Sequence, residues 1–149
     1  MSDIIWMQHA LDLAHKAHAQ GEVPIGAVLV DEHNQLLGCG WNQVVQTNDP
    51  TAHAEIMAIR DATKRLHNYR LQNTTLYVTL EPCCMCAGAM VHTRIQRVVF
   101  ATRDLNAGAC GSVFNLLQGY PLNHQIQIDE GFLQQDCDLL LRDFFKSRR

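Results

Sequence analysis

Hydrophobic residues near the amino terminus recur with the period of an amphipathic helix. Ser2 and Asp3 are residue types that favour the start of a helix, and Gly21 favours its end. The pattern therefore predicts a helix that runs from the start of the chain to about Gln20. The residues expected on its buried face are Ile4, Met7, Leu11 and Ala14.

The next two hydrophobic stretches are typical of a β-hairpin. The almost unbroken apolar run from Pro24 to Asp31 indicates a strand that is covered on both faces. Polar residues 32–35 provide a turn, and the chain is expected to return as a second strand from Leu36 to about Val45.

Helical and strand patterns alternate along the rest of the chain, and Thr51 is a good N-cap for the first of these helices. This alternation predicts one three-layer α/β/α domain over residues 1–149, built on a mixed sheet. The expected elements are a helix from Ala52 to about Leu66, a strand over Leu76–Leu80, a helix from Cys83 to about His92, a strand over Val98–Ala101, a glycine-bearing loop over Thr102–Gly111, a short strand over Gln125–Ile128 and a closing amphipathic helix marked by Leu133, Cys137, Leu140, Leu141 and Phe144.

The composition is that of an ordinary globular protein, with 47% hydrophobic and 18% charged residues among 149. No apolar run approaches the roughly 18 residues that would span a bilayer, and the amino terminus lacks the features of a signal peptide. These patterns predict a cytoplasmic protein without a membrane partner. The net charge of −3 argues against a general nucleic-acid coating protein but leaves room for local basic patches.

Two short segments carry the candidate chemistry: residues 51–55 (TAHAE) and residues 81–86 (EPCCMC). Each stands at or near the start of a predicted helix. Cys83 and Cys86 are three residues apart, so their sulfur atoms would project from one face of the first helical turn. The free amides of that turn favour the thiolate form that binds metal ions. Together with His53, the two cysteines would give zinc three ligands and leave a fourth position for water.

Glu55 points to a catalytic rather than a structural metal site. A structural zinc site would need a fourth protein ligand. A hydrolytic site instead needs a carboxylate beside the water that zinc activates, because this carboxylate can accept a proton and return it to the substrate. His-x-Glu followed by Pro-Cys-x-x-Cys is the signature of zinc-dependent nucleobase deaminases. The two segments therefore predict hydrolytic deamination of a nucleobase.

The other four cysteines have no matching ligand partners in the sequence. In the reducing compartment expected here, disulfides are rare and isolated cysteines pack as small hydrophobic residues. A redox role for the cysteine cluster is an alternative, but it would not require Glu55. The cysteines expected to serve only for packing are Cys39, Cys84, Cys110 and Cys137.

Beyond these segments, the chain resembles the bacterial tRNA-specific adenosine deaminases over most of its length. The resemblance implies a cytidine-deaminase-like fold with a five-stranded sheet flanked by helices, one zinc ion per subunit and a homodimer. It also implies conversion of adenosine to inosine at wobble position 34 of the arginine tRNA with anticodon ACG, with Glu55 as the proton shuttle. The segments that carry the resemblance are DPTAHAEIMAIR, TLEPCCMCAGAMVHTRIQRVVFATRD, GACGS, LNH and LLLRDFFKSRR.

The same resemblance implies positions that contact the substrate. Judged from the residues alone, Asn42 could simply end a strand and Asp104 could cap a turn. The face of the last helix that carries Phe144 could simply pack into the hydrophobic core. The loop over residues 43–48 matches the family poorly, which bears on substrate contacts rather than on the chemistry. The implied substrate-binding residues are Asn42, Ala54, Asp104, Asn123, His124, Phe144 and Arg149.

Two alternatives remain open from the sequence. The first is a deaminase of a free nucleobase or nucleoside such as guanine or cytosine, because the same zinc ligands and glutamate would serve either ring. The basic carboxyl-terminal end and the segments around Asp104 and Asn123 favour RNA, since an enzyme for small molecules does not need them. The second alternative is a zinc-stabilised binding module without catalysis, against which Glu55 argues.

Overall fold

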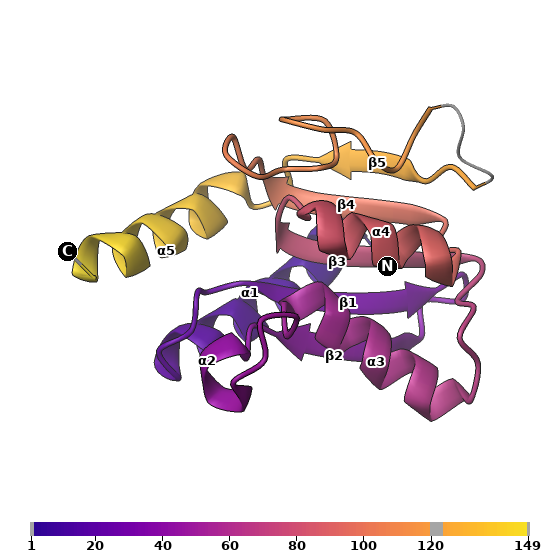
Figure 1. Cartoon of the computed structure of the whole chain (residues 1–149), viewed down its shortest axis with the longest axis horizontal. Helices are drawn as coiled ribbons and strands as arrows, with labels where there is room; N and C mark the ends of the chain where they lie inside the picture. The colour runs from indigo at the N-terminus through magenta and orange to yellow at the C-terminus, as the bar shows by residue number, and fades with distance from the viewer. Residues whose placement is uncertain (1, 120–123, 149) are drawn as a thin grey trace.

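The computed structural model of the chain describes residues 2–119 and 124–148. Helices lie on both faces of one sheet, as Figure 1 shows, which confirms the predicted three-layer α/β/α architecture. In chain order the elements are α1 (Asp3–Ala19), β1 (Gly26–Asp31), β2 (Leu36–Trp41), α2 (Val44–Thr47), α3 (Ala54–Leu66), β3 (Thr74–Leu80), α4 (Cys84–Thr93), β4 (Arg97–Thr102), β5 (Gln127–Glu130) and α5 (Gln134–Ser147).

The five strands form a mixed sheet in the order β2-β1-β3-β4-β5. β1 pairs antiparallel with both β2 and β3, whereas β3, β4 and β5 are parallel to one another. Parallel strands end at the same edge of a sheet, so the carboxyl ends of β3 and β4 lie side by side. Ligand sites of open α/β sheets are found at this edge.

The sheet separates two hydrophobic cores. Alternate residues of β1 point to opposite faces, so Ala27 and Leu29 join α3 and α4 while Val28 and Val30 join α1 and α5. Every residue of β1 except Asp31 is buried, which confirms a central strand covered on both faces. The functional consequence is that α3 and α4 are held side by side on one face.

Glycines of β2 set the distance between this strand and α3. A Cβ atom on Gly40 would lie 2.4 Å from the carbonyl oxygen of Ala54, and one on Gly38 would lie 2.6 Å from that of Ala58. The helix therefore rests directly on the strand backbone. Asp61 adds a hydrogen bond, because its Oδ2 accepts the N–H of Cys39 at 3.0 Å.

Two predicted boundaries were wrong because side chains distant in the sequence determine them. The second strand ends at Trp41, not near Val45, because the carboxylate of Glu22 accepts the N–H groups of Val45 and Gln46 and stabilises the turn of α2. The helix expected from Ala52 begins at Ala54, where the side chain of Asn42 accepts the first free N–H.

The remaining differences concern Thr51, the last strand and one exposed residue. Thr51 does not cap α3, since its hydroxyl and N–H both bind Asp49. β5 covers 127–130 rather than 125–128. Ile4, predicted to be buried, is 49% exposed because it lies at the margin of a face centred on Met7 and Ala10.

Candidate metal centre and substrate site

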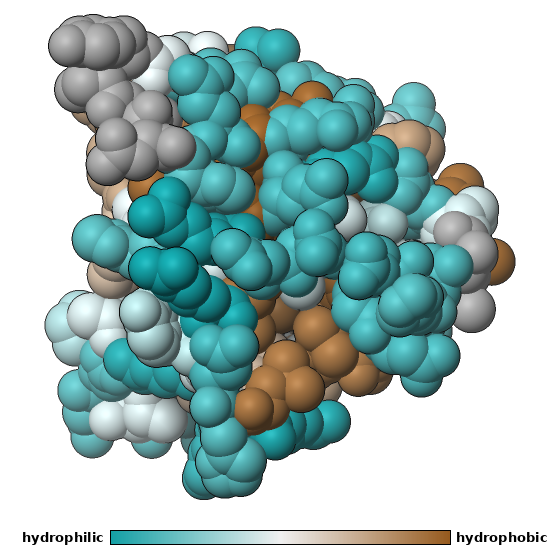
Figure 2. Space-filling view, turned by 90° about the vertical axis from the view of Figure 1, so that its right-hand side faces the viewer, coloured by the Kyte–Doolittle hydropathy of each residue, from teal (hydrophilic) through white to brown (hydrophobic). Residues whose placement is uncertain are grey.

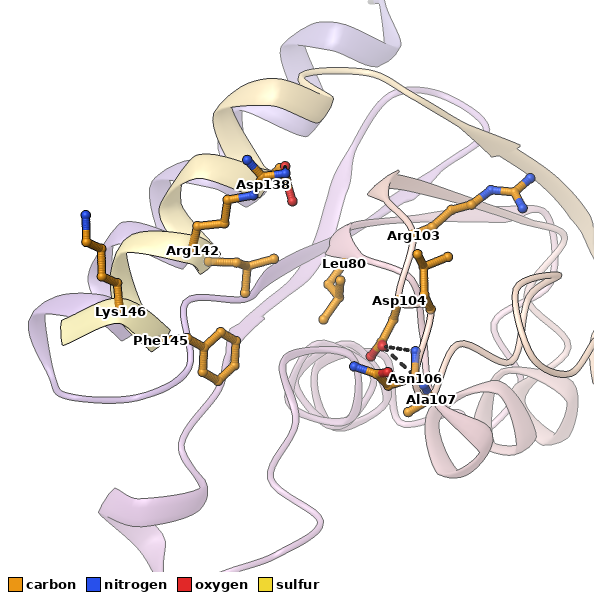
Figure 3. A pocket seen from close by; sticks show the side chains of 11 residues that line it. Leu80, Arg103, Asp104, Asn106, Ala107, Asp138, Arg142, Phe145 and Lys146 are labelled. Atoms are coloured by element: carbon orange, nitrogen blue, oxygen red, sulfur yellow. Dashed lines mark hydrogen bonds and ion pairs between the residues drawn. The ribbon is translucent and has the colours of Figure 1, made fainter. Parts of the chain in front are cut away.

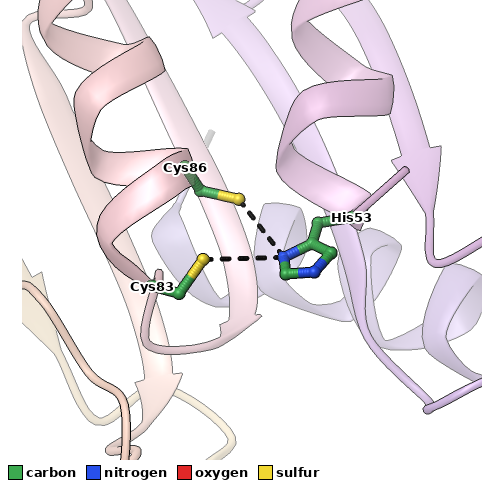
Figure 4. A group of neighbouring side chains, drawn as sticks. All are labelled: His53, Cys83 and Cys86. Atoms are coloured by element: carbon green, nitrogen blue, oxygen red, sulfur yellow. Dashed lines mark hydrogen bonds between the residues drawn. The ribbon is translucent and has the colours of Figure 1, made fainter. Parts of the chain in front are cut away.

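The first two turns of α3 and α4 meet at the carboxyl edge of β3, and both helices begin at a predicted metal ligand. His53 is the N-cap of α3 and Cys83 is the N-cap of α4, with Cys86 one turn further along α4. Pro82 precedes Cys83, and its carbonyl oxygen accepts the N–H of Ala109 at 2.8 Å. The side chains of all three predicted ligands converge on one point (Figure 4).

The spacing of the donor atoms fits a zinc ion. His53 Nδ1 lies 3.6 Å from the Sγ atoms of both Cys83 and Cys86. Zinc bonds of about 2.3 Å to sulfur and about 2.0–2.1 Å to nitrogen, at tetrahedral angles, place N and S roughly 3.5–3.6 Å apart. Among the described residues no fourth His, Cys, Asp or Glu joins this group, so the donor set matches a catalytic zinc site with one open position.

The electrostatics of the centre also favour a cation. Hydrogen bonding from Cys86, together with the neighbouring His53, lowers the pKa of the Cys83 thiol to about 3, despite partial burial. The pKa of His53 is raised by its hydrogen bond to Cys83 and by the charge of Glu55. The pKa of Cys86 is raised, first by its hydrogen bond with Cys83, so one of the two sulfur atoms is already a thiolate, the form of cysteine that binds zinc.

Glu55 lies in the first turn of α3, two residues after His53, and is only 4% exposed. Burial raises the pKa of its carboxyl group to about 7, partly opposed by the backbone N–H of Glu55 and by the charge of His53. A carboxyl group that titrates near neutrality can both accept and donate a proton. The structure therefore places a proton-transfer group beside the three donor atoms.

Asn42 and Ala54 are linked to each other by a hydrogen bond. The Oδ1 atom of Asn42 accepts the N–H of Ala54 at 3.0 Å, and Asn42 is 6% exposed. This bond fixes the amide so that its Nδ2 group remains available as a donor. The side chain of Ala54 is fully buried in the core beneath α3, so the structure does not direct it toward an open site.

A cavity of about 650 Å³ opens at the same edge of the sheet, between α5 and the loop after β4. Leu80 lies at its centre, with Arg142, Phe145 and Lys146 of α5 on one side and Arg103 and Asp104 on the other, as Figure 3 shows. Its lining combines apolar residues with three cations and two acids, Asp104 and Asp138. The exposed aromatic ring and the cations would suit a base with its attached phosphate. The zinc donors do not line it.

Asp104 has both of the properties considered from the sequence. Its Oδ1 accepts the N–H groups of Asn106 and Ala107, so it orders a turn, and it also lines the cavity.

Of the two aromatic residues near the end of α5, Phe144 is only 6% exposed and packs against His18 and Arg148. Phe145, 53% exposed, is the aromatic residue of α5 that faces the cavity.

The remaining predicted positions do not join the centre. His124 lies beyond the carboxyl end of α4, where its Nε2 is 2.7 Å from the carbonyl oxygen of Ile95. Helix α4 separates this position from Cys83, which starts the same helix. Figure 2 looks onto that end of the molecule, where hydrophilic residues dominate and hydrophobic residues form a smaller strip. Asn123 and Arg149 lie outside the described residues.

The other cysteines differ in exposure. Cys110 and Cys137 are buried and Cys39 is half-buried, in agreement with the packing role predicted for them. The same prediction was wrong for Cys84, which is exposed.

Sequence reasoning missed two buried acids as functional candidates, Glu22 and Glu81, which are 1% and 2% exposed. In the sequence, each of these acids could have been noticed because it stands next to a predicted buried strand.

None of the helices in the described ranges has the length and apolar character needed to cross a membrane.

Comparisons with known proteins agree with this geometry. The family model described as the cytidine and deoxycytidylate deaminase zinc-binding region matches residues 1–102. A protein of Haemophilus influenzae named tRNA-specific adenosine deaminase is 52% identical over 143 residues, which is 96% of this chain and 83% of the relative.

Two solved structures have similar folds. One comes from a study of A-to-I editing by tRNA:A34 deaminases at the wobble position of transfer RNA; it is 38% identical, with a TM-score of 0.87, and the match covers 91% of this chain and 98% of that one. The other is a guanine deaminase from Nitrosomonas europaea, 25% identical with a TM-score of 0.83, covering 96% and 84%.

Proposed function

The chain belongs to the cytidine and deoxycytidylate deaminase family and, within it, to the tRNA-specific adenosine deaminases, and on this premise we propose that it converts adenosine to inosine at wobble position 34 of tRNA. The reaction consumes one water and releases ammonia. The observation that carries the proposal is the cluster of His53, Cys83 and Cys86 with the buried carboxyl group of Glu55 beside it.

In this proposal His53, Cys83 and Cys86 hold the zinc ion, which supplies Lewis-acid activation of a water molecule when it is bound. The two cysteines bring negative charge and fix the metal at the start of α4. His53 joins them from α3, so the metal would also tie the two helices together. Replacement of His53 by Ala leaves two thiolates, which make a poor site, so zinc content and activity should fall together.

Glu55 moves the protons. Its carboxylate accepts the proton of the attacking water, delivers it to N1 of the adenine ring and then assists the departure of ammonia from C6. A pKa of about 7 suits both directions of transfer at neutral pH. Burial of Glu55 excludes bulk water from this relay, since only 4% of the residue is exposed.

Asn42 orients the base in the proposed complex. Its Oδ1 is already used by the N–H of Ala54, so the free Nδ2 group would donate to a ring nitrogen of the purine. The same bond couples base recognition to the start of α3, the helix that carries Glu55. Replacement by Asp would keep the bond to Ala54 but remove the donor.

The cavity beside α5 is the proposed path of the anticodon loop. Specific RNA recognition relies on splayed bases that stack on aromatic side chains and on cations that contact phosphates. Phe145 supplies the aromatic surface, and Arg103, Arg142 and Lys146 supply the cations. Asp104 would meet a base edge from the opposite wall.

Finer features of the proposal follow from the resemblance rather than from the geometry. They are an arginine tRNA with anticodon ACG as the substrate, a homodimer as the working form, the cytoplasm as its location, and residues 1–149 as one catalytic domain. The free thiols at the metal centre suit a reducing compartment.

The test is inosine formation at position 34, measured with purified protein and an arginine tRNA transcript that carries ACG. Free adenosine, cytidine and guanine are incubated in parallel. Inosine on the tRNA alone is the expected result. Turnover of a free base without inosine on the tRNA would instead assign the chain to the small-molecule deaminases, of which the guanine deaminase is a structural neighbour.

A truncation separates the same alternatives. Deletion of residues 145–149 removes Phe145 and Lys146 from the cavity, whereas the three metal ligands lie outside the deleted segment. The tRNA reaction should weaken far more than any reaction on a free nucleoside. Equal losses on both substrates would contradict the proposed RNA path. If the full chain binds zinc but turns over none of these substrates, a binding module is favoured instead.

A further inference from the structure

The loop that follows β4, residues 104–112, joins the metal centre to the cavity. Its first part, Asp104 to Ala107, lines the cavity beside α5. Its second part is buried, with Ala109 and Cys110 in the same hydrophobic core as Ala54 and Cys86. The shape of this loop therefore determines how the proposed RNA path meets the site of chemistry.

Four hydrogen bonds attach this loop to one buried side chain, that of Glu81. The carboxylate accepts the N–H groups of Asp104 at 3.1 Å, Cys110 at 3.0 Å and Ser112 at 3.1 Å, and it also accepts the Ser112 hydroxyl. Glu81 lies between the end of β3 and Pro82, which precedes the first cysteine ligand. It therefore connects the loop to the segment that carries the metal ligands.

Glu81 forms no ion pair among the described residues. An isolated buried carboxylate is costly unless hydrogen bonds replace its hydration. The N–H groups of Asp104, Cys110 and Ser112 and the Ser112 hydroxyl replace that hydration for Glu81. The dependence is mutual, because the same N–H groups would lose their acceptor if the carboxylate were absent.

Packing at Gly108 reinforces this arrangement. A Cβ atom at this position would lie 2.4 Å from Cδ of Glu81, so only glycine allows the loop to pass this close to the carboxylate. The N–H of Gly108 also donates to the carbonyl oxygen of Asp104 at 2.9 Å. The carboxylate of Glu81 is therefore hydrogen-bonded by both ends of the loop and packs against Gly108 in its middle.

We propose that Glu81 is a positioning residue that holds loop 104–112 as the wall between the metal centre and the RNA cavity. It touches no reacting atom, so its role is to prepare the loop for RNA before binding. A loop that must be ordered during association lowers affinity for the substrate. This proposal rests on the proposed function for its substrate, although the order of the loop can be measured without any activity.

The experiment compares the wild type with Glu81→Gln, whose amide has the same shape but cannot accept all four bonds. Amide hydrogen exchange at Asp104, Cys110 and Ser112 should accelerate about tenfold or more. For an anticodon stem-loop, KM should rise about tenfold while kcat changes by less than about threefold, as expected when binding alone is impaired. Zinc content should remain one per chain.

Two further variants keep the test decisive if Glu81→Gln folds poorly. Ser112→Ala removes one donor and should raise KM by a smaller factor, and Gly108→Ala should perturb the loop through its clash with the carboxylate. The matched control is Glu32→Gln, because Glu32 is exposed and, within the described ranges, its carboxylate has a polar contact only with His33. It should change neither the exchange rates nor KM.

The outcomes separate this proposal from the proposed function. Unchanged loop exchange in Glu81→Gln would overturn the positioning role, and so would loss of zinc and kcat with KM unchanged, which would instead assign Glu81 to the metal centre. If wild-type protein forms no inosine on the stem-loop, the proposed function fails. The exchange measurement would still decide whether Glu81 orders the loop.

Discussion

Glu55 and Glu81 are both buried acids, but their surroundings prepare them for opposite states. Burial raises the pKa of Glu55 to about 7, so its carboxyl group can exchange a proton near neutral pH. Four donors surround Glu81 and hold it in the ionised state. The number of hydrogen-bond donors around each carboxyl group therefore distinguishes a proton carrier from a structural anion.

Glu55→Gln should remove turnover without removing the metal. Gln has nearly the same shape but cannot accept the proton of water, so the rate of inosine formation should fall by roughly 10²–10⁴-fold. Zinc content, measured by atomic absorption, should remain one per chain because Glu55 is not one of the clustered donors. A variant that keeps more than about a tenth of the wild-type rate would contradict the assigned role.

Among the secondary-structure elements, the close packing of α3 on β2 sets the position of the metal site. Gly40→Ala would place a methyl group 2.4 Å from the carbonyl oxygen of Ala54. Forcing α3 away from β2 should lower the free energy of unfolding by about 1–3 kcal/mol, as overpacking usually does. Because His53 is the N-cap of α3, zinc affinity should weaken as well; chemical denaturation and metal titration measure the two effects.

The control for this change is Gly88→Ala in α4, where a Cβ atom would meet nothing within 4 Å. Alanine favours the helical state over glycine by up to about 1 kcal/mol, so this variant should be as stable as the wild type or more so. Equal destabilisation by both substitutions would show that the close approach of α3 to β2 is not the cause.

An ion-pair cluster joins α1 to the sheet and predicts acid sensitivity. Arg97 donates to both oxygens of Asp3, at 2.9 and 2.8 Å, and to Asp129 at 2.7 Å. The hydrogen bond from Arg97 lowers the pKa of Asp3, although burial opposes this. A lowered folded-state pKa gives stability that is present above the unfolded pKa of about 3.9 and is lost as the pH falls through the folded pKa.

Asp3→Asn should therefore cost about 1–2 kcal/mol of unfolding free energy between about pH 5 and 8, and the difference from wild type should shrink below about pH 4. Urea denaturation across this range provides the measurement. Asp12→Asn, on the same helix, is the control, because among the described residues the side chain of Asp12 forms a hydrogen bond only with Gln8. A difference between Asp3→Asn and wild type that does not vary with pH would contradict the ion-pair explanation.

The sequence predicted those elements and ligands whose determinants are local. The burial of β1 follows from its own apolar residues, and the grouping of Cys83 with Cys86 follows from their spacing on one helical turn. The start of α3 could not be predicted, because Asn42 caps it from twelve residues away. Neither could the loop after β4, whose hydrogen-bond acceptor, Glu81, lies 23 to 31 residues before its donors.

At the scale of the whole molecule, a chain with net charge −3 must concentrate its cations to bind a polyanion. Several exposed cations are neutralised locally: Arg103 pairs with Glu130 and Arg142 pairs with Asp138. Lys146 also lines the cavity, and no ion pair involving it occurs among residues 2–119 and 124–148. It is therefore the cation on α5 best placed to contact a phosphate.

Lys146→Ala should reduce the salt dependence of RNA binding. Each phosphate contact contributes about 0.7–0.9 to the slope of log K against log salt concentration, so its loss should lower the slope by about that amount. Lys64→Ala is the matched control, because Lys64 lies in the last turn of α3, at the end of the helix away from His53. Fluorescence anisotropy with an anticodon stem-loop measures both slopes. If both variants lower the slope equally, the RNA is attracted by the overall charge; if only Lys146→Ala does, the cavity beside α5 binds the phosphate backbone.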